Sequence, residues 1–399
     1  MKFNHLLAIA GLVICVLVDL YIYKAIKHRV QHRKTILTRL HLISATIGYA
    51  CLFTAIALPR QSGDNDVLIT DMWLIFIFMS MLLCKLLFCI FDWISLLPRL
   101  LHRNRWKFLS AAGVAISVLL FGAMWWGALV NRNRVSVTET VINTPRWPDA
   151  FDGYKIAQIS DLHVGSWGTD TTFLSKLVDN INALGPDLIV FTGDIVNRQS
   201  DEFTPMVSTF SRLKATDGVL AIMGNHDYGD YRSWPDETAH IADQENLHNL
   251  YNQTGHRLLL NETQFIKRGS DSIAVIGVEN IGEPPFSIYG DLDASYPDTS
   301  DSLPKILLTH NPAHWSADIK NNPLRNIDLT LSGHTHAMQV QICGFTPSSF
   351  RYSTPWGLYT DSIGHSLVVN RGAGTVGMPM RLGATPEITL ITLRSRKQN

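Results

Sequence analysis

Cysteine and charge are both scarce in this sequence of 399 residues. Only 17% of the residues are charged and 46% are hydrophobic, which excludes an intrinsically disordered chain. The five cysteines are too few for a disulfide scaffold, and four of them lie in long apolar stretches. Cys343 is alone in the second half of the chain, so no internal disulfide indicates an oxidising compartment. We interpret Cys343 as a small buried side chain.

Net charge is also absent, but its absence hides an asymmetry. The 34 basic and 34 acidic residues cancel over the whole chain, whereas residues 1–134 have 15 basic and 5 acidic residues, a balance of +10. Residues 135–399 have the opposite balance, −10. A basic part beside an acidic part indicates a membrane or nucleic-acid partner for the basic part.

Four long apolar runs identify residues 1–134 as a transmembrane region. Each is close to the ~20 residues that cross a bilayer core as a helix, and the runs cover about 6–23, 42–58, 72–90 and 108–130. The alternative, a soluble helical bundle, would need polar helix faces that these runs lack. We place the charges of Asp19 and Lys85 near an interface, where long side chains snorkel. We therefore expect a lipid bilayer as partner and no nucleic acid.

The charges of the connecting loops predict an orientation. The first loop has six basic residues and no acid, and the third loop has four basic residues. The second loop has three acids against one arginine. The positive-inside rule places the two basic loops in the cytoplasm. We therefore expect a multi-pass membrane protein in which everything after residue 130 is extracytoplasmic.

Beyond a polar stretch at 135–150, which we interpret as a linker, short apolar runs alternate with helical patterns. This alternation predicts a layered α/β domain over residues 151–399. Five of the expected strands are followed directly by histidine, aspartate or asparagine. Because ligands bind at the carboxyl ends of strands in α/β folds, we expect these side chains to meet at one site. They are Asp161, His163, Asp194, Asn225, His310, His334 and His336.

This set of four imidazoles, two carboxylates and one amide predicts a metal centre. Mixed nitrogen and oxygen donors favour Mn, Fe, Zn or Co over Ca or Mg. Seven ligands are too many for one tetrahedral ion but suit two divalent ions that share a carboxylate. Such a pair hydrolyses a phosphoester or phosphodiester by attack of metal-bound hydroxide. His226 is placed to protonate the leaving group, and Asp227 either orients His226 or starts a helix.

Taken together, the motifs resemble the calcineurin-like metallophosphoesterase family over roughly residues 150–395. The resemblance implies a four-layer α/β/β/α sandwich with the metals at one sheet edge. It also implies that Asp194 bridges two ions. The matching motifs are Asp161-x-His163, Gly193-Asp194, Gly224-Asn225-His226-Asp227, His310 and Gly333-His334-x-His336. By the same resemblance, Asp161, His163, Asp194 and His336 hold one metal, and Asp194, Asn225, His310 and His334 hold the other.

The stretch from Asn370 to Arg381 resembles the bacterial membrane-associated branch of that family, which implies a bacterial inner or cell membrane. Some members of this branch cleave UDP-linked acylated glucosamine, although an extracytoplasmic site conflicts with a substrate made in the cytoplasm. We interpret Arg371 and Arg381 as candidate substrate ligands, because arginine in a glycine-rich loop suits phosphate. Surface arginines are the alternative. Residues 228–255 form either a substrate cap, a membrane contact or ordinary packing.

These observations predict a membrane-anchored, metal-dependent phosphoric ester hydrolase acting on a phosphorylated small molecule or lipid. Two alternatives stay open. One is a lipid-pyrophosphate hydrolase of the UDP-2,3-diacylglucosamine type. The other is a non-catalytic membrane sensor or binding module with a structural metal site, although a structural site has no need of the unligated His226.

Overall fold

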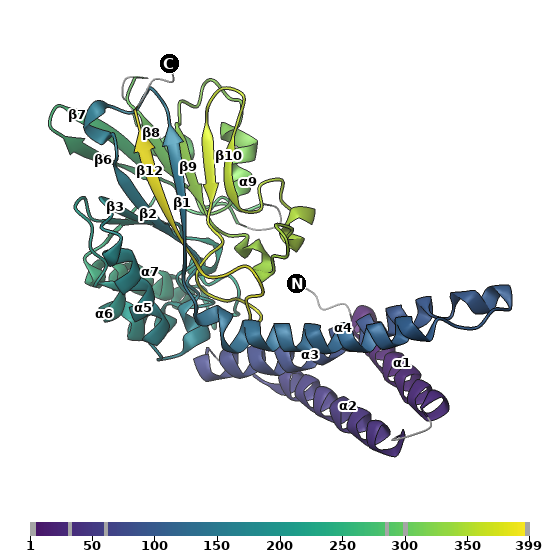
Figure 1. Cartoon of the computed structure of the whole chain (residues 1–399). Helices are drawn as coiled ribbons and strands as arrows, with labels where there is room; N and C mark the ends of the chain where they lie inside the picture. The colour runs from purple at the N-terminus through teal and green to yellow at the C-terminus, as the bar shows by residue number, and fades with distance from the viewer. Residues whose placement is uncertain (1–4, 31–33, 60–62, 284–286, 298–301, 396–399) are drawn as a thin grey trace. The chain divides into compact units, whose positions relative to one another are not determined.

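The computed structural model describes residues 5–30, 34–59, 63–283, 287–297 and 302–395. The chain divides into two compact units. The helical unit comprises residues 1–60 and 70–127, and the α/β unit comprises residues 61–69 and 128–399. Each is described by itself below (Figure 1).

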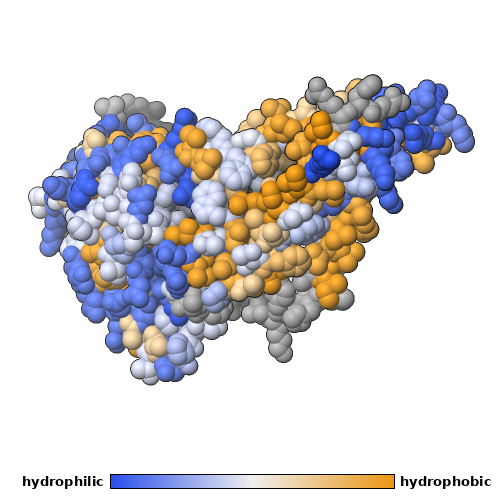
Figure 2. Space-filling model, turned by 90° about the horizontal axis from the view of Figure 1, so that it is seen from below, coloured by the Kyte–Doolittle hydropathy of each residue, from blue (hydrophilic) through white to orange (hydrophobic). Residues whose placement is uncertain are grey.

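The helical unit contains four long helices: α1 (His5–Arg29), α2 (Lys34–Ala57), α3 (Asn65–Ile94) and α4 (Lys107–Leu129). All four are long and apolar enough to cross a membrane. They carry many exposed apolar side chains, such as Leu17, Ile43 and Leu119. Figure 2 shows a hydrophobic surface over the helices. A bilayer would cover such a surface. The predicted transmembrane region is confirmed.

The two charges inside the helices, which the sequence analysis placed near an interface, face each other in the structure. Asp19 of α1 is 2.8 Å from Nζ of Lys85 of α3. Tyr49 of α2 donates a hydrogen bond of 2.8 Å to the same carboxylate, and Nε2 of His41 lies 3.7 Å from it. The charges therefore compensate each other between helices, which is the usual solution for ionisable groups within a bilayer.

Two six-stranded sheets form the α/β unit. The first has the order β1 (Ser136–Asn143), β12 (Glu387–Arg394), β2 (Lys155–Ile159), β3 (Leu188–Phe191), β4 (Val219–Ala221) and β5 (Arg257–Leu258). The second has the order β10 (Gly357–Thr360), β11 (Ser366–Val369), β9 (Leu329–Ser332), β8 (Lys305–Leu308), β7 (Asp271–Gly277) and β6 (Glu262–Arg268). Strands β2 to β5 are parallel, as are β7, β8, β9 and β11.

The sheets pack face to face over an apolar core that includes Ile156, Val190, Ile306 and Leu331. Helices α5 (Thr172–Ala183), α6 (Val207–Phe210) and α7 (Glu237–Thr254) cover the outer face of the first sheet. Helices α8 (Leu292–Ser295) and α9 (Pro312–His314) and the turn Trp315–Ile319 lie on the second sheet. Because both faces of the central strands are covered, these strands are continuous apolar runs. The predicted four-layer sandwich is confirmed.

Two local predictions need correction. Residues 135–150 are not simply a linker, because 136–143 form β1, which pairs in parallel with β12 along its whole length. As an edge strand with only one fully buried residue, β1 has no apolar run to reveal it. Cys343 is exposed rather than buried, because it lies in a tight surface turn between the bridged residues Ile342 and Phe345.

Candidate metal centre

The seven predicted ligands lie on loops directly after five parallel strands. Asp161 and His163 follow β2, Asp194 follows β3, and Asn225 follows β4. The second sheet contributes His310 after β8 and the pair His334 and His336 after β9. The donor atoms of six of them fall into two groups, and within each group all atoms lie within 4.8 Å of one another. The groups are Asp161, His163, Asp194 and His336, and Asp194, His310 and His334.

The first group is tightly closed. Nε2 of His163 lies 3.0 Å from Nε2 of His336 and 3.6 Å from Oδ2 of Asp194. Oδ1 of Asp161 is 3.2 Å from Nε2 of His336. Two imidazoles and two carboxylates thus point their donor atoms at one another, an arrangement that would suit a cation between them.

The second group shares a carboxylate with the first. Oδ2 of Asp194, which faces His163, is also 3.1 Å from Nε2 of His310. Nδ1 of His334 is 3.2 Å from the same His310 nitrogen. Oδ1 of Asn225 lies 3.0 Å from His310 and 2.8 Å from His334, so the amide oxygen joins this group. Asp194 therefore stands at the position that a bridging ligand would occupy.

Backbone strain marks the same residues. Asp161, His163, Asp194, His334 and His336 all have positive φ, between 42° and 71°. Side chains other than glycine rarely adopt this conformation, and such strain concentrates at functional sites. Two glycines allow the close approach of the loops. A Cβ on Gly224 would lie 2.2 Å from Oδ1 of Asp194, and one on Gly333 would lie 2.4 Å from Oδ2 of Asp161.

Backbone hydrogen bonds orient the donors. The N–H of His226 donates to Oδ1 of Asp194 at 2.8 Å, which leaves Oδ2 to face both groups. Nδ1 of His163 is 3.1 Å from the carbonyl of Val196, and Nδ1 of His310 is 2.7 Å from the carbonyl of Thr192. A carbonyl can only accept, so it fixes the ring proton on Nδ1 and leaves the Nε2 lone pair for a metal.

Electrostatics also suit a cation. Burial, and then His226, lower the pKa of His163 well below its usual range. Burial, and then His310, lower that of His334 to about 3, so both rings are neutral donors. Although burial opposes it, the neighbouring histidines hold the pKa of Asp194 well below its usual range. The carboxylate of Asp194 in turn outweighs the burial of His310 and raises its pKa to about 9. A bound cation would replace the proton that this histidine retains.

His226 lies beside the two groups. Its ring stacks on Tyr231, with centroids 4.0 Å apart, and meets the ring of His163 edge to face at 4.8 Å. Its Nδ1 is 2.7 Å from the carbonyl of Asn197. This bond keeps a proton on Nδ1 and orients the ring.

Of the two predictions for Asp227, the structure supports the start of a helix. Asp227 lies in the first turn of the short helix Asn225–Tyr228, and its carboxylate accepts from the N–H of Gly224 just before that helix. Its buried carboxylate accepts hydrogen bonds from the backbone N–H groups of Asp194, Ile195, Val196 and Gly224 at 2.8–3.2 Å. Asp227 therefore holds together the loops that carry Asp194 and Asn225, and its role is structural.

The structure also uses Arg371 and Arg381 internally, in place of the predicted substrate contact. Arg371 pairs with Glu387 at 3.1 Å. Arg381 is fully buried and donates to the carbonyls of Gly374, Arg371 and Ala384 at 2.6–3.0 Å. Its Nη2 also lies 3.2 Å from Nδ1 of His336, so Arg381 supports a predicted ligand from behind.

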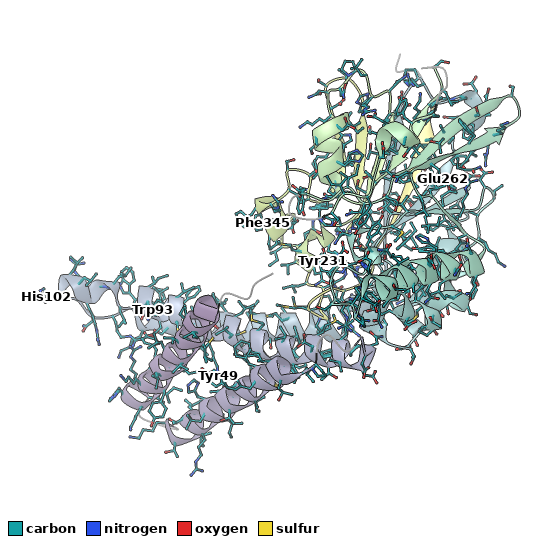
Figure 3. The ribbon with its side chains drawn as sticks, turned by 180° about the vertical axis from the view of Figure 1, so that it is seen from behind. Tyr49, Trp93, His102, Tyr231, Glu262 and Phe345 are labelled. Carbon is teal, nitrogen blue, oxygen red and sulfur yellow. The ribbon has the colours of Figure 1, made fainter. Side chains whose placement is uncertain are left out.

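Two tyrosines contact predicted ligands. Tyr231 belongs to the 228–255 segment, for which a substrate cap was one of the predictions, whereas Tyr352 was not predicted. Tyr231 (Figure 3) accepts a 2.6 Å hydrogen bond from Nδ2 of Asn225, and the hydroxyl of Tyr352 lies 3.0 Å from Nε2 of His334. Both line a pocket of about 260 Å³ that also includes Arg351. No motif marks a tyrosine in a loop, although Tyr231 follows the Gly224–Asp227 motif closely. The rest of 228–255 is mainly α7, which packs on the first sheet through Leu247, Leu250 and Tyr251.

Comparison with known proteins agrees with this geometry. Residues 154–338 match the model of the calcineurin-like phosphoesterase family, and residues 5–132 match that of a probable calcineurin-like phosphoesterase transmembrane domain. A metallophosphoesterase of Bacillus subtilis named YkuE is 31% identical, over 69% of this chain and 95% of that protein. A transmembrane protein with metallophosphoesterase domain from Danio rerio is 27% identical, over 76% of this chain and 69% of its own. The UDP-2,3-diacylglucosamine pyrophosphatase LpxG of Chlamydia trachomatis is 27% identical, over 61% of this chain and 78% of its own.

Proposed function

This chain belongs to the calcineurin-like phosphoesterase family, and from that premise we propose that it is a membrane-anchored, two-metal hydrolase of a phosphoester or phosphodiester. The observation that carries the proposal is the position of Asp194, whose Oδ2 faces His163 in one donor group and His310 in the other. A non-catalytic module with a structural metal would not need two donor groups and a free histidine beside them.

In this proposal Asp161, His163, Asp194 and His336 hold one divalent ion, and Asp194, Asn225, His310 and His334 hold the other. The mixed donors favour Mn, Fe, Zn or Co. Two such ions, held by these residues, would lower the pKa of a water molecule toward ~7 and would neutralise charge on a phosphoryl oxygen. The protein supplies orientation: its loops hold the donors in place before substrate binds.

His226 has the remaining chemical role. The carbonyl of Asn197 accepts from Nδ1–H of His226, which leaves Nε2 for the substrate. In this proposal Nε2 contacts the phosphoryl oxygen or protonates the leaving group. Tyr231 stacks on the ring and limits its rotation. The pocket lined by Tyr231, Tyr352 and Arg351 is where the substrate's remaining groups would bind.

A hydrolysis assay with the full-length protein and a soluble aryl phosphodiester tests the proposal. We expect Asp194→Asn to lower kcat/KM by at least a hundredfold, and His226→Gln to lower it by about 10²–10⁴-fold. Asp236→Asn is the matched control, because this exposed carboxylate caps α7, where asparagine serves equally well. Full activity of Asp194→Asn would refute the mechanism.

One observation favours a lipid substrate over a soluble one. The loop after His336 exposes four large apolar side chains, Met338, Ile342, Phe345 and Phe350, with exposed fractions from 52% to 86%. Figure 3 shows Phe345 at the surface. The loop leads directly into Arg351 and Tyr352 of the pocket. Acyl chains would cover such a surface, and the relative LpxG is named for a diacylated substrate.

Two substrates separate the alternatives. If the natural substrate is a lipid phosphoester or pyrophosphate, serine at both Phe345 and Phe350 lowers the hydrolysis of UDP-2,3-diacylglucosamine or of a phospholipid in mixed micelles. Hydrolysis of the soluble aryl ester is then unchanged. An equal effect on both substrates, or on neither, would favour a soluble phosphorylated substrate.

We also propose that the four helices cross a bacterial inner or cell membrane and that the α/β unit lies outside the cytoplasm. The charges of the loops between the helices support this orientation. The loops between α1 and α2 and between α3 and α4 are basic, and the positive-inside rule places such loops in the cytoplasm. A periplasmic-type alkaline phosphatase reporter should be active after Asn399 and inactive after Arg103, and the reverse pattern would invert the topology.

A further inference from the structure

The four membrane helices line an open cavity that the proposed hydrolysis does not use. Its volume is about 620 Å³, within the usual range of small-ligand sites. Every helix contributes apolar side chains to its wall, including Ile22 of α1, Leu37 of α2, Phe88 of α3 and Val118 of α4. A wall of this kind is suited to an acyl chain.

One end of the cavity is charged. Arg29 at the end of α1 and Arg105 just before α4 both pair with the carboxylate of Asp92 in α3. The Asp92 side chain is only 1% exposed, and Ser110 donates to it at 2.6 Å. Two cations share one anion, so this end has excess positive charge. Figure 2 shows hydrophilic residues gathered at the end of the helices that carries the turn between α3 and α4.

The charged cluster of Arg29, Asp92 and Arg105 has a hydrogen-bond donor without an acceptor. Nε of Arg105 is buried and has no hydrogen-bond acceptor among the residues that the structure describes. A buried guanidinium N–H without an acceptor is unfavourable, and an anionic oxygen is the acceptor that arginine binds most strongly. Membrane topology alone would favour arginines at this end, but it would not bury one of them against Asp92 with a donor unsatisfied.

We propose that this cavity binds one glycerophospholipid with an anionic headgroup. Its phosphate accepts from Arg105 and Arg29, and an acyl chain lies along Ile22, Val114 and Val118. Charge complementarity selects this occupant. Free phosphate would leave the apolar wall uncovered, and a choline headgroup would bring a third cation next to Arg29 and Arg105. In the proposed orientation the charged end faces the cytoplasmic leaflet, where anionic lipids supply the matching charge.

Native mass spectrometry of the full-length protein in a neutral detergent tests the site. The probes are palmitoyl-oleoyl phosphatidylglycerol, the matching phosphatidylcholine, and inorganic phosphate. We expect one phosphatidylglycerol per chain, bound at least tenfold more tightly than phosphatidylcholine and not displaced by millimolar phosphate. Arg105→Gln should weaken its binding about tenfold. Arg103→Gln, which changes an exposed residue of the same loop, should leave it unchanged.

A second pair of variants leaves the charged cluster intact. Ala111 lines the cavity, so Ala111→Trp should fill part of it and lower lipid occupancy at least tenfold. Ala115 is exposed and lies outside the cavity lining, so Ala115→Trp should have no effect. Equal binding of the two lipids, displacement by phosphate, or unchanged binding in a monodisperse Ala111→Trp protein would each overturn the proposal. None of these outcomes depends on hydrolytic activity.

Discussion

Asp227→Asn tests the finding that this carboxylate is structural. Its two oxygens accept four backbone hydrogen bonds: Oδ1 from Ile195 and Val196, and Oδ2 from Asp194 and Gly224. The residue is 1% exposed, so water cannot replace these bonds. Asparagine keeps one oxygen, and its NH₂ group necessarily faces two N–H donors.

The loss of stability in Asp227→Asn can be estimated from these hydrogen bonds. Two hydrogen bonds to a charged acceptor disappear, each contributing about 1.5–3 kcal/mol, so unfolding becomes easier by about 3–6 kcal/mol. At about 2–4 °C per kcal/mol for a domain of this size, the Tm falls by roughly 10–20 °C. The displaced loops carry Asp194 and Asn225, so metal occupancy should fall as well.

Thermal unfolding of the full-length protein in detergent measures this effect. Asp236→Asn again serves as control, because its single capping bond survives the change, and its Tm should stay within about 2 °C of the wild type. A Tm for Asp227→Asn equally close to the wild type would refute the structural role. If that stable protein were also inactive, the prediction that Asp227 orients His226 would be favoured again.

Three further predictions concern buried groups around the site. Burial raises the pKa of Glu202 from 4.5 to about 7, so the folded state binds the proton more tightly than the unfolded state. Stability should then fall by about 3 kcal/mol as pH rises from 4.5 to 7, and Glu202→Gln should flatten this dependence in thermal unfolding. If the stability of Glu202→Gln fell with pH as steeply as that of the wild type, the raised pKa of Glu202 would be contradicted. Gly333→Ala should lower metal affinity at least tenfold by equilibrium dialysis, because its Cβ would lie 1.9 Å from Oγ of Ser160. Gly122→Ala, with open space around it, is the control, and equal affinities would show that the loop adapts. Arg381→Met should lower the Tm because three carbonyls lose a donor, with KM for the aryl ester unchanged. A tenfold higher KM at an unchanged Tm would restore the substrate contact.

The sequence predicted the strands and the donor set well, for a physical reason. Strands such as β3 and β11 are covered on both faces, so they stand out as short apolar runs. Polar residues follow these strands directly, and their spacing in short motifs makes it predictable that they come together at one sheet edge. The membrane helices were equally clear, because a bilayer demands long apolar runs.

What the sequence could not predict depends on contacts between distant residues. β1 is recognisable only by its pairing with β12, about 250 residues later. The role of Arg381 was misjudged because an arginine in a loop has the same appearance in sequence whether it binds substrate or backbone. The pairing of Asp19 with Lys85 likewise depends on how α1 and α3 pack, which no local pattern records.

The central claim is that one carboxylate, Asp194, joins two metal sites. Metal analysis of the purified full-length protein, alongside its hydrolysis of an aryl phosphodiester, tests it directly. We predict about two divalent ions per chain in the wild type, two in an inactive His226→Gln variant, and fewer than one in Asp194→Asn. A fully active protein with one ion per chain or none, or an Asp194→Asn variant that keeps both ions and full activity, would contradict the account.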